Sequence, residues 1–236
     1  MAKGPSRTVD YYVWLMSDWA YLGGVRFVQM ATRHGIRINH IPMRMQDVYA
    51  GSGGVLLAQR SWQRRAYRIM ELKRWRAKLG TRLNIEPKYF PADVDLASCM
   101  VIAGQRRQLP VADLVNAIMR AIWAEDQDVS NPGVLLTIAE HHGLDGAALL
   151  EAARAEEVRA EYRDNTARAL TAGVFGSPFY AFAGQLFWGQ DRLDMLEETI
   201  VRSVGRDLGR TSEVNFATQS RKSASSLSKT PPPKQP

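Results

Sequence analysis

The sequence contains few of the residues that would indicate a redox, metal or membrane function. Cys99 is the single cysteine among 236 residues, which excludes a CxxC motif, a disulfide framework and a thiolate metal site. The four histidines lack the spacing of metal ligands, and no Gly-x-Ser-x-Gly motif is present. No segment approaches the ~18 uninterrupted apolar residues of a membrane span, and Asp10 and Asp18 interrupt any signal-peptide core. We therefore expect a cytoplasmic protein without a metal or a membrane segment.

Positive charge is in excess, but most of it lies near the C-terminus. The net charge is +7, and the segment from Gly209 onward carries +4 of it through five basic residues and one acidic residue. The rest of the chain carries +3, and within it the run from Arg60 to Arg82 is strongly basic, with nine basic residues and one acid, Glu71. This pattern is weak evidence for nucleic acid. Nucleic-acid binding through residues 60–82 is a minor alternative hypothesis for the function. A binding constant that does not depend on salt concentration would exclude it.

The first forty residues predict a strand, a helix and a second strand. Residues 8–15 are rich in Val, Tyr and Trp and almost continuously apolar, as in a strand buried on both faces. Residues 19–34 have a helical apolar stripe that ends before Gly35, and residues 36–42 form another strand pattern. Such a βαβ unit is right-handed and has parallel strands.

The middle of the chain predicts helices, and strands return near its end. After a glycine-rich loop at 50–54, helical patterns cover 61–79, 95–105, 113–125, 131–143 and 145–172. Short strand patterns at 179–182 and 186–188 predict a hairpin, followed by a helix over 192–204.

These elements predict an α/β protein with a thioredoxin-like fold that carries an inserted all-helical domain. The thioredoxin-like domain is split between residues 8–48 and 172–206, and the insertion covers 49–171. A connection can hold a whole domain when its ends lie close together. We expect disorder at 1–7 and 209–236, where Ser, Thr, Lys and Pro dominate the C-terminal segment.

Ser17 lies where the first strand gives way to the first helix. Serine is a preferred N-cap residue, and this role alone accounts for most serines in such a position. The unpaired N–H groups of a helix N-terminus also favour negative charge. A second motif, Gly-x-Phe-Gly-x-Pro at 173–178, places Pro178 just before a strand, where the preceding bond can be cis. In a thioredoxin-type layout we expect this cis-proline loop to face Ser17 and Ser177 to pair with an extended peptide ligand.

The chain resembles the 2-hydroxychromene-2-carboxylate isomerase family, which is related to kappa-class glutathione transferases and DsbA-like oxidoreductases. The resemblance covers about residues 8–205, and its most specific part is the pair of motifs Gly-x-Phe-Gly-x-Pro (173–178) and Trp-Gly-x-Asp-Arg (188–192). The other segments that carry it are 17–23, 58–64 with Tyr67, Arg74 and Trp75, and 83–91.

The resemblance implies a glutathione site. Ser17 matches the family serine whose hydroxyl donates to the glutathione sulfur and favours the thiolate, so glutathione rather than serine is the nucleophile. Ser177 and Pro178 would bind the cysteinyl backbone of glutathione. Gln190 and Asp191 match the positions that bind its γ-glutamyl end. The alternative role for Asp191 is a helix N-cap, and the two roles can coexist. The family forms homodimers.

The family reaction opens a cyclic hemiketal and isomerises a double bond, with glutathione adding and leaving again. Its substrate is an aromatic carboxylate. Arg64 or its neighbours in the basic helix and Asn84 are candidates to bind the carboxylate, and Trp19 is a candidate for the aromatic ring. Most residues of the basic helix are otherwise expected to form a solvated face, and Trp19 could belong to the core.

Two departures separate this chain from the family pattern. Asp18 follows Ser17 where the family commonly has Pro, and Trp62 replaces another frequent Pro. A carboxylate beside the thiolate is expected to raise the pKa of the thiol. Besides the isomerase, two further hypotheses therefore stay open: a glutathione transferase or peroxidase on the same site, and a thioredoxin-fold binding protein without catalysis.

Overall fold

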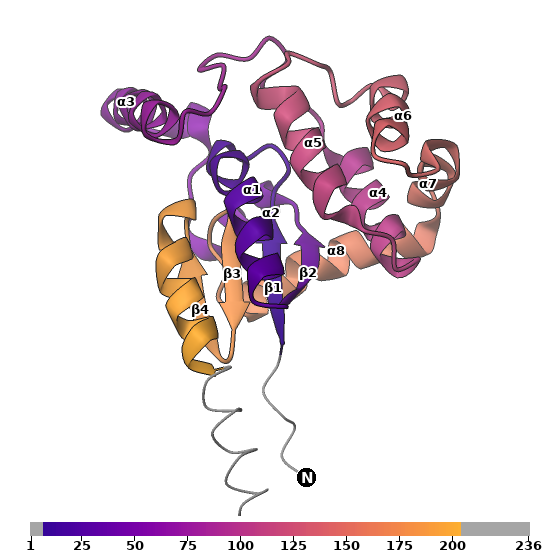
Figure 1. Cartoon of the computed structure of the whole chain (residues 1–236). Helices are drawn as coiled ribbons and strands as arrows, with labels where there is room; N and C mark the ends of the chain where they lie inside the picture. Colours follow the sequence, from indigo (N-terminus) through magenta and orange to yellow (C-terminus); the bar gives the residue numbers. More distant parts are fainter. Residues whose placement is uncertain (1–6, 204–236) are drawn as a thin grey trace, which may run out of the picture.

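A four-stranded mixed sheet organises the molecule (Figure 1). The computed structural model describes residues 7–203, so the predicted disordered termini lie outside the described residues except for Arg7. The strand order is β2-β1-β3-β4, and β1 (Thr8–Val13) runs parallel to β2 (Arg37–Pro42). On its other side β1 pairs antiparallel with β3 (Phe179–Phe182), which forms a hairpin with β4 (Gln185–Trp188). The predicted βαβ unit and hairpin are confirmed.

Both faces of β1 are buried, as its sequence predicts. Because side chains alternate along a strand, neighbouring residues enter different hydrophobic clusters. Tyr11 packs in the cluster that includes α1 (Asp18–Arg33), whereas Tyr12 packs in the cluster that includes α2 (Met45–Ser52) and α8 (Glu156–Thr171). Helices therefore cover the sheet on its two sides.

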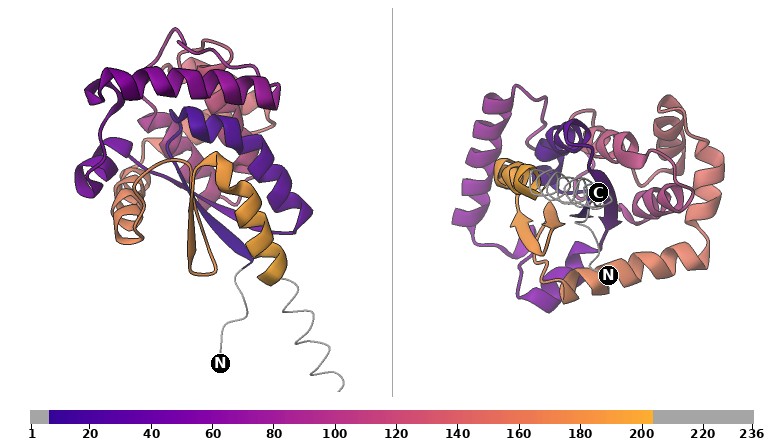
Figure 2. Two further views of the ribbon diagram at one scale, coloured as in Figure 1. Left: turned by 90° about the vertical axis from the view of Figure 1, so that its left-hand side faces the viewer. Right: turned by 60° about the horizontal axis from the view of Figure 1, so that its bottom comes forward.

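The remaining helices follow β2 and return the chain to β3. They are η1 (Leu57–Gln59), α3 (Trp62–Leu79), α4 (Asp95–Arg106), α5 (Val111–Trp123), α6 (Pro132–His141) and α7 (Gly146–Ala153). Figure 1 shows α4–α7 gathered on one side of the sheet and α3 apart from them. In the left view of Figure 2, α3 lies across the top of the molecule, above α1 and the helix formed by residues 193–203.

The helix α3 has far less contact with the rest of the protein than the other long helices. Leu72 is its only buried residue, although it spans 18 residues, whereas nine residues of α5 are buried. Its N-terminus is capped by Ser61, whose side chain accepts a hydrogen bond from the Arg64 N–H group. Most of its basic side chains are exposed, as expected for a solvated face.

Two expected elements differ in the structure. The predicted helix over 145–172 is two helices, α7 and α8, separated by Ala155 in an extended conformation. The reason is packing: both helices contact α4, but α7 also contacts α6, whereas α8 also contacts α2 and β2. One straight helix cannot reach both sets of partners. The predicted loop 50–54 is partly helical, because buried Met45 and Val48 hold α2, which continues to Ser52.

No helix among residues 7–203 is both long enough and apolar enough to span a lipid bilayer.

Candidate functional site

Ser17 caps the N-terminus of α1 directly after β1. Its side chain is buried, and Oγ accepts a hydrogen bond from the Ala20 N–H group at 3.2 Å. The Ser17 N–H group donates to the Trp14 carbonyl at 2.8 Å, so a tight turn joins strand and helix. The predicted N-cap is confirmed, and it places a hydroxyl at the positive end of the α1 dipole.

The cis-proline loop contacts Ser17 across 160 positions of sequence. The bond between Ser177 and Pro178 is cis, as the fold predicts. Ser17 Oγ donates a hydrogen bond to the Ser177 carbonyl at 3.0 Å, and the Trp14 N–H group donates to Ser177 Oγ at 2.9 Å. The Ser177 N–H group makes no hydrogen bond with any residue in the range 7–203. It is therefore a free backbone donor beside Ser17, suited to an extended peptide ligand.

Two adjoining cavities meet at Ser177. The smaller lies beside Ser17 and is mostly aromatic and apolar, with lining residues Trp14, Met16, Ser17, Asp18, Trp19, Met45, Tyr49, Leu56, Leu57, Arg60, Arg68, Phe90 and Ser177. The larger is a groove of about 390 Å³ that runs to the start of the last helix. Trp19, Tyr49, Arg60 and Ser177 line both cavities, which therefore form one site.

The far end of the groove is formed by the turn η2 (Gln190–Arg192). Gln190 is buried, and its backbone and side-chain oxygens both accept hydrogen bonds from Arg26 of α1. Asp191 is more exposed and pairs with Arg192 at 2.8 Å. Asp191 makes no side-chain cap to this turn, so the N-cap alternative for it is wrong. Its carboxylate lines the groove instead.

A glycine lets an aromatic wall close over the groove. Trp188 lies against Gly176, where a Cβ atom would be only 2.3 Å from the indole nitrogen. The Trp188 ring also packs edge-on against Phe175, with 4.8 Å between the centroids. The family motifs at 173–178 and 188–192 therefore meet in space, which explains why this glycine and this tryptophan occur together.

Two arginines of the middle segment enter the site with different partners. Arg68 of α3 binds Asp18, with Nε at 2.7 Å and Nη2 at 2.5 Å from Oδ2. Arg60 instead donates from Nε to the Val55 carbonyl at 2.9 Å and from Nη2 to the Tyr49 hydroxyl at 3.1 Å. Arg60 forms no ion pair with a carboxylate of the described part of the chain. It is therefore the available cation of the site.

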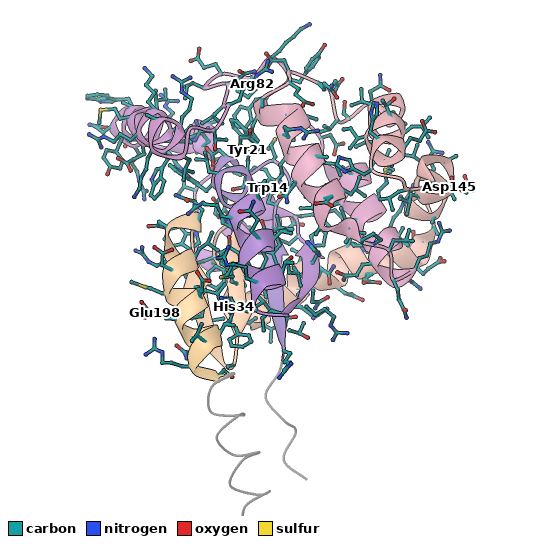
Figure 3. All side chains as sticks on the ribbon, in the orientation of Figure 1. Trp14, Tyr21, His34, Arg82, Asp145 and Glu198 are labelled. Carbon is teal, nitrogen blue, oxygen red and sulfur yellow. The ribbon has the colours of Figure 1, made fainter. Side chains whose placement is uncertain are left out.

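The structure brings some predicted substrate residues to this site and not others. Trp19 lines both cavities. Arg64 is exposed on α3 and is not among the lining residues, nor is Asn84, whose N–H group donates to the Trp123 carbonyl. Tyr21 and Arg82, labelled in Figure 3, are joined by a hydrogen bond from the Tyr21 hydroxyl to the Arg82 carbonyl. That bond ties α1 to the segment after α3.

Sequence reasoning missed Tyr49, Arg60, Arg68 and Phe90. A signal for Arg68 existed, because a carboxylate at a buried helix start needs a partner and the basic segment offered several. Which arginine it is depends on how α3 lies over α1, and spacing alone does not decide that. Among the described residues, no cluster of three or more His, Cys, Asp or Glu could hold a metal ion.

Comparison with known proteins places this chain in a family. The family described as the DSBA-like thioredoxin domain matches residues 8–201. The 2-hydroxychromene-2-carboxylate isomerase of Sphingobium xenophagum is 30% identical over 197 residues, covering 83% of this chain and 99% of that protein. The structure of a 2-hydroxychromene-2-carboxylate isomerase superposes with a TM-score of 0.72 at 23% identity, covering 88% of this chain and 98% of the other.

A cytosolic disulfide reductase of Pseudomonas aeruginosa, DsbM, whose structure was determined with GSH, has the same fold. Its TM-score is 0.61 at 18% identity, covering 85% of this chain and 98% of that one.

The chain belongs to the DSBA-like thioredoxin family. Within that family it is a relative of the 2-hydroxychromene-2-carboxylate isomerases, and these homologues support an isomerase role.

Proposed function

We propose that this protein is a glutathione-dependent isomerase of 2-hydroxychromene-2-carboxylate-type aromatic acids. The observation that carries the proposal is the Ser17 hydroxyl held against the Ser177 carbonyl, at a helix N-terminus, in a cavity with aromatic walls and a free cation. The isomerase names of the relatives supply the reaction class. The resemblance supplies glutathione, which the DsbM structure also contains.

The residues of the site fit glutathione. The free Ser177 N–H group and its carbonyl, which keeps a second lone pair, suit the cysteinyl backbone of the tripeptide. Asp191 offers a carboxylate for the γ-glutamyl ammonium, and the backbone N–H groups at the start of the last helix suit its carboxylate. Pro178 shapes the loop that presents Ser177. When bound, glutathione supplies a thiolate that adds reversibly to a conjugated substrate.

Ser17 is the thiol-activating residue in this proposal. Its single hydroxyl proton is donated to the Ser177 carbonyl, and its oxygen accepts from the Ala20 N–H group. A thiolate next to Ser17 is a stronger acceptor than a carbonyl, because hydrogen bonds to charged groups are stronger. The hydroxyl therefore turns from Ser177 toward the sulfur, and the α1 N-terminus adds to the stabilisation.

The substrate binds in the cavity beside Ser17. Trp14, Trp19 and Phe90 offer aromatic surface to a planar ring, and Arg60 is the cation available to a carboxylate. Tyr49 holds the Arg60 guanidinium from below, with the guanidinium carbon 5.9 Å from the ring centroid. A guanidinium suits the two oxygens of a carboxylate. Arg60 thus takes the role that the basic segment suggested for Arg64.

The decisive experiment measures hydroxychromene-carboxylate isomerisation by absorbance, with and without reduced glutathione. We expect activity only with glutathione, and a loss of about 100-fold or more in S17A, because an activating hydrogen-bond donor is removed. Loss of the N-cap costs only ~1 kcal/mol of stability, so the variant still folds. Equal rates in the two proteins would refute the role of Ser17.

The second experiment tests the carboxylate site. R60M is expected to raise the KM for the aromatic acid about 10- to 100-fold and to change kcat less, because a charge-assisted hydrogen bond is lost. R64M is the matched control, since Arg64 is an exposed arginine on the adjacent helix. Equal effects of R60M and R64M contradict the assignment.

The same assays separate the other hypotheses. Net consumption of glutathione with a chlorinated aromatic compound would indicate a transferase. Absence of glutathione binding in calorimetry would indicate a binding protein without catalysis. We further propose that the protein acts in the cytoplasm, where a buried single cysteine stays reduced.

A further inference from the structure

Asp18 occupies the first position of α1, where the family pattern commonly has Pro. Its carboxylate is almost completely buried, with 6% of the residue exposed. Oδ1 accepts a hydrogen bond from the Trp19 N–H group at 2.7 Å, and Oδ2 accepts both Arg68 hydrogen bonds. A buried carboxylate thus lies next to the thiol-activating serine, with one arginine as its counterion.

Arg68 is held as firmly as Asp18. Its side chain is 13% exposed, and its guanidinium carbon lies 5.7 Å from the ring centroid of Phe90 and 5.8 Å from that of Trp123. A guanidinium over the faces of aromatic rings is stabilised by cation–π attraction. Since Leu72 is the only buried residue of α3, the ion pair is a second tether between α3 and the N-terminus of α1.

The negative charge of Asp18 has to be balanced if a thiolate is to bind next to Ser17. Burial raises the pKa of Asp18, while Arg68, the Trp19 N–H group and, more weakly, Arg60 act in the opposite direction. A guanidinium at hydrogen-bond distance favours the ionised carboxylate. Asp18, Arg60 and Arg68 are the charged residues that line the cavity beside Ser17. Without Arg68, an unpaired negative charge would stand beside a thiolate.

We propose that Arg68 is a positioning residue that neutralises Asp18, so that a thiolate at Ser17 is not repelled, and that fixes α3 over the site. The inference rests on the proposed function for its thiol, but its electrostatic part concerns the position of Ser17 alone. Asp18 and Arg68 then act as one unit in place of proline, and Arg60 is left to bind a substrate anion. The departure from the family pattern is thereby compensated within the same cavity.

A thiol placed at position 17 tests this without glutathione. In S17C the introduced thiol occupies the position of the Ser17 hydroxyl, and its pKa follows from thiolate absorbance or alkylation rate against pH. The natural cysteine does not interfere, because Cys99 is buried and burial raises its pKa to about 11. The series adds R68M, D18N, both together, R68K, or the control R64M to S17C.

The two single changes are expected to move the thiol pKa in opposite directions. R68M leaves Asp18 unpaired and raises the pKa by about 1 unit or more, whereas D18N leaves Arg68 unpaired and lowers it similarly. The double variant D18N/R68M returns close to the parent, and R64M stays within a few tenths of it. R68K keeps the charge but not the planar fork, so it raises the pKa less than R68M does. Opposite shifts that cancel are not produced by a merely structural role.

The thiol pKa series tests the role of Arg68 separately from the proposed function. Shifts of equal sign, or shifts no larger than that of R64M, overturn the proposal. If R68M does not fold, D18N decides it, because D18N must still lower the pKa of the thiol. Calorimetry with glutathione on the unmodified protein and on R68M then tests the proposed function. If the unmodified protein does not bind glutathione while the S17C series behaves as expected, the proposed function fails and the charge compensation stands.

Discussion

The N-terminal end of α1 and the helix α3 form the two walls of the site, and they are built differently. The α1 wall is held by buried hydrogen bonds between Ser17, Trp14 and Ser177, over a sheet whose two faces are covered. The α3 wall has one buried apolar residue, Leu72, and one buried ion pair, Arg68 with Asp18.

The two walls have different roles in the proposed function. In this proposal the α1 wall activates a thiol, which requires a hydroxyl and backbone groups in fixed positions. In the same proposal the α3 wall closes the cavity near the ring and carboxylate of the substrate, where a few contacts decide specificity. A lightly packed helix tolerates substitution better than the sheet does, so the α3 wall is the part of the site that can adapt to another aromatic acid.

The largest expected effect comes from L72A, which shortens the one buried apolar side chain of α3. Truncating this fully buried leucine is expected to cost about 2–5 kcal/mol. Because α3 has no other buried residue, the loss falls on its docking to the body. Amide hydrogen exchange, followed by mass spectrometry, is expected to rise throughout α3 while β1 and α1 keep their protection.

F27A is the matched control for L72A on the α1 side. Phe27 is fully buried and packs against Tyr11 and Tyr180, with ring centroids 4.9 Å and 4.7 Å apart. Its truncation costs about 3–5 kcal/mol and lowers protection in the sheet and in α1 together. If L72A also exposes β1 and α1, the two walls are one cooperative unit and the comparison is wrong.

A smaller effect, confined to the sheet side, comes from pH. His40 of β2 is buried, its ring nitrogens have no partner among residues 7–203, and burial lowers its pKa from 6.5 to about 4. The unfolded chain therefore takes up a proton near pH 6.5 and the folded chain only near pH 4. Stability is full above pH 6.5 and falls between these values, by ~2 kcal/mol from pH 7 to pH 5.

Urea unfolding of the natural protein and H40Q at both pH values measures this effect. The loss of stability on acidification is expected to shrink in H40Q by the His40 contribution. An identical pH dependence in both proteins would show that His40 is not the source.

Much of the fold could be predicted because its signals are local. Alternating and helical apolar patterns identify β1, α1, β2 and the terminal hairpin, and the order of these elements allows few topologies. The break between α7 and α8 could not be predicted in the same way, because Ala, Glu and Arg near residue 155 all favour helix. It depends on two sets of packing partners that only the folded chain brings together.

The residues of the candidate site could likewise be predicted only in part. Ser17, Ser177 and Pro178 could be predicted from a short motif and a resemblance, because the sheet determines their meeting. Arg60 and Arg68 could not, since nine basic residues share one segment and the choice among them depends on the placement of η1 and α3. Asp18 was recognised as a departure, but its partner lies 50 positions away.

The side chains of Ser17 and Cys99 determine how the protein reacts with oxidants. The side chain of Ser17 ends in a hydroxyl oxygen, and oxygen forms no disulfide. The one natural thiol, Cys99, is buried in α4, and burial raises its pKa to about 11. In the proposed function the site therefore holds a small thiol without linking to it covalently, and oxidised thiols in the cell find no exposed cysteine among the described residues with which to form a disulfide.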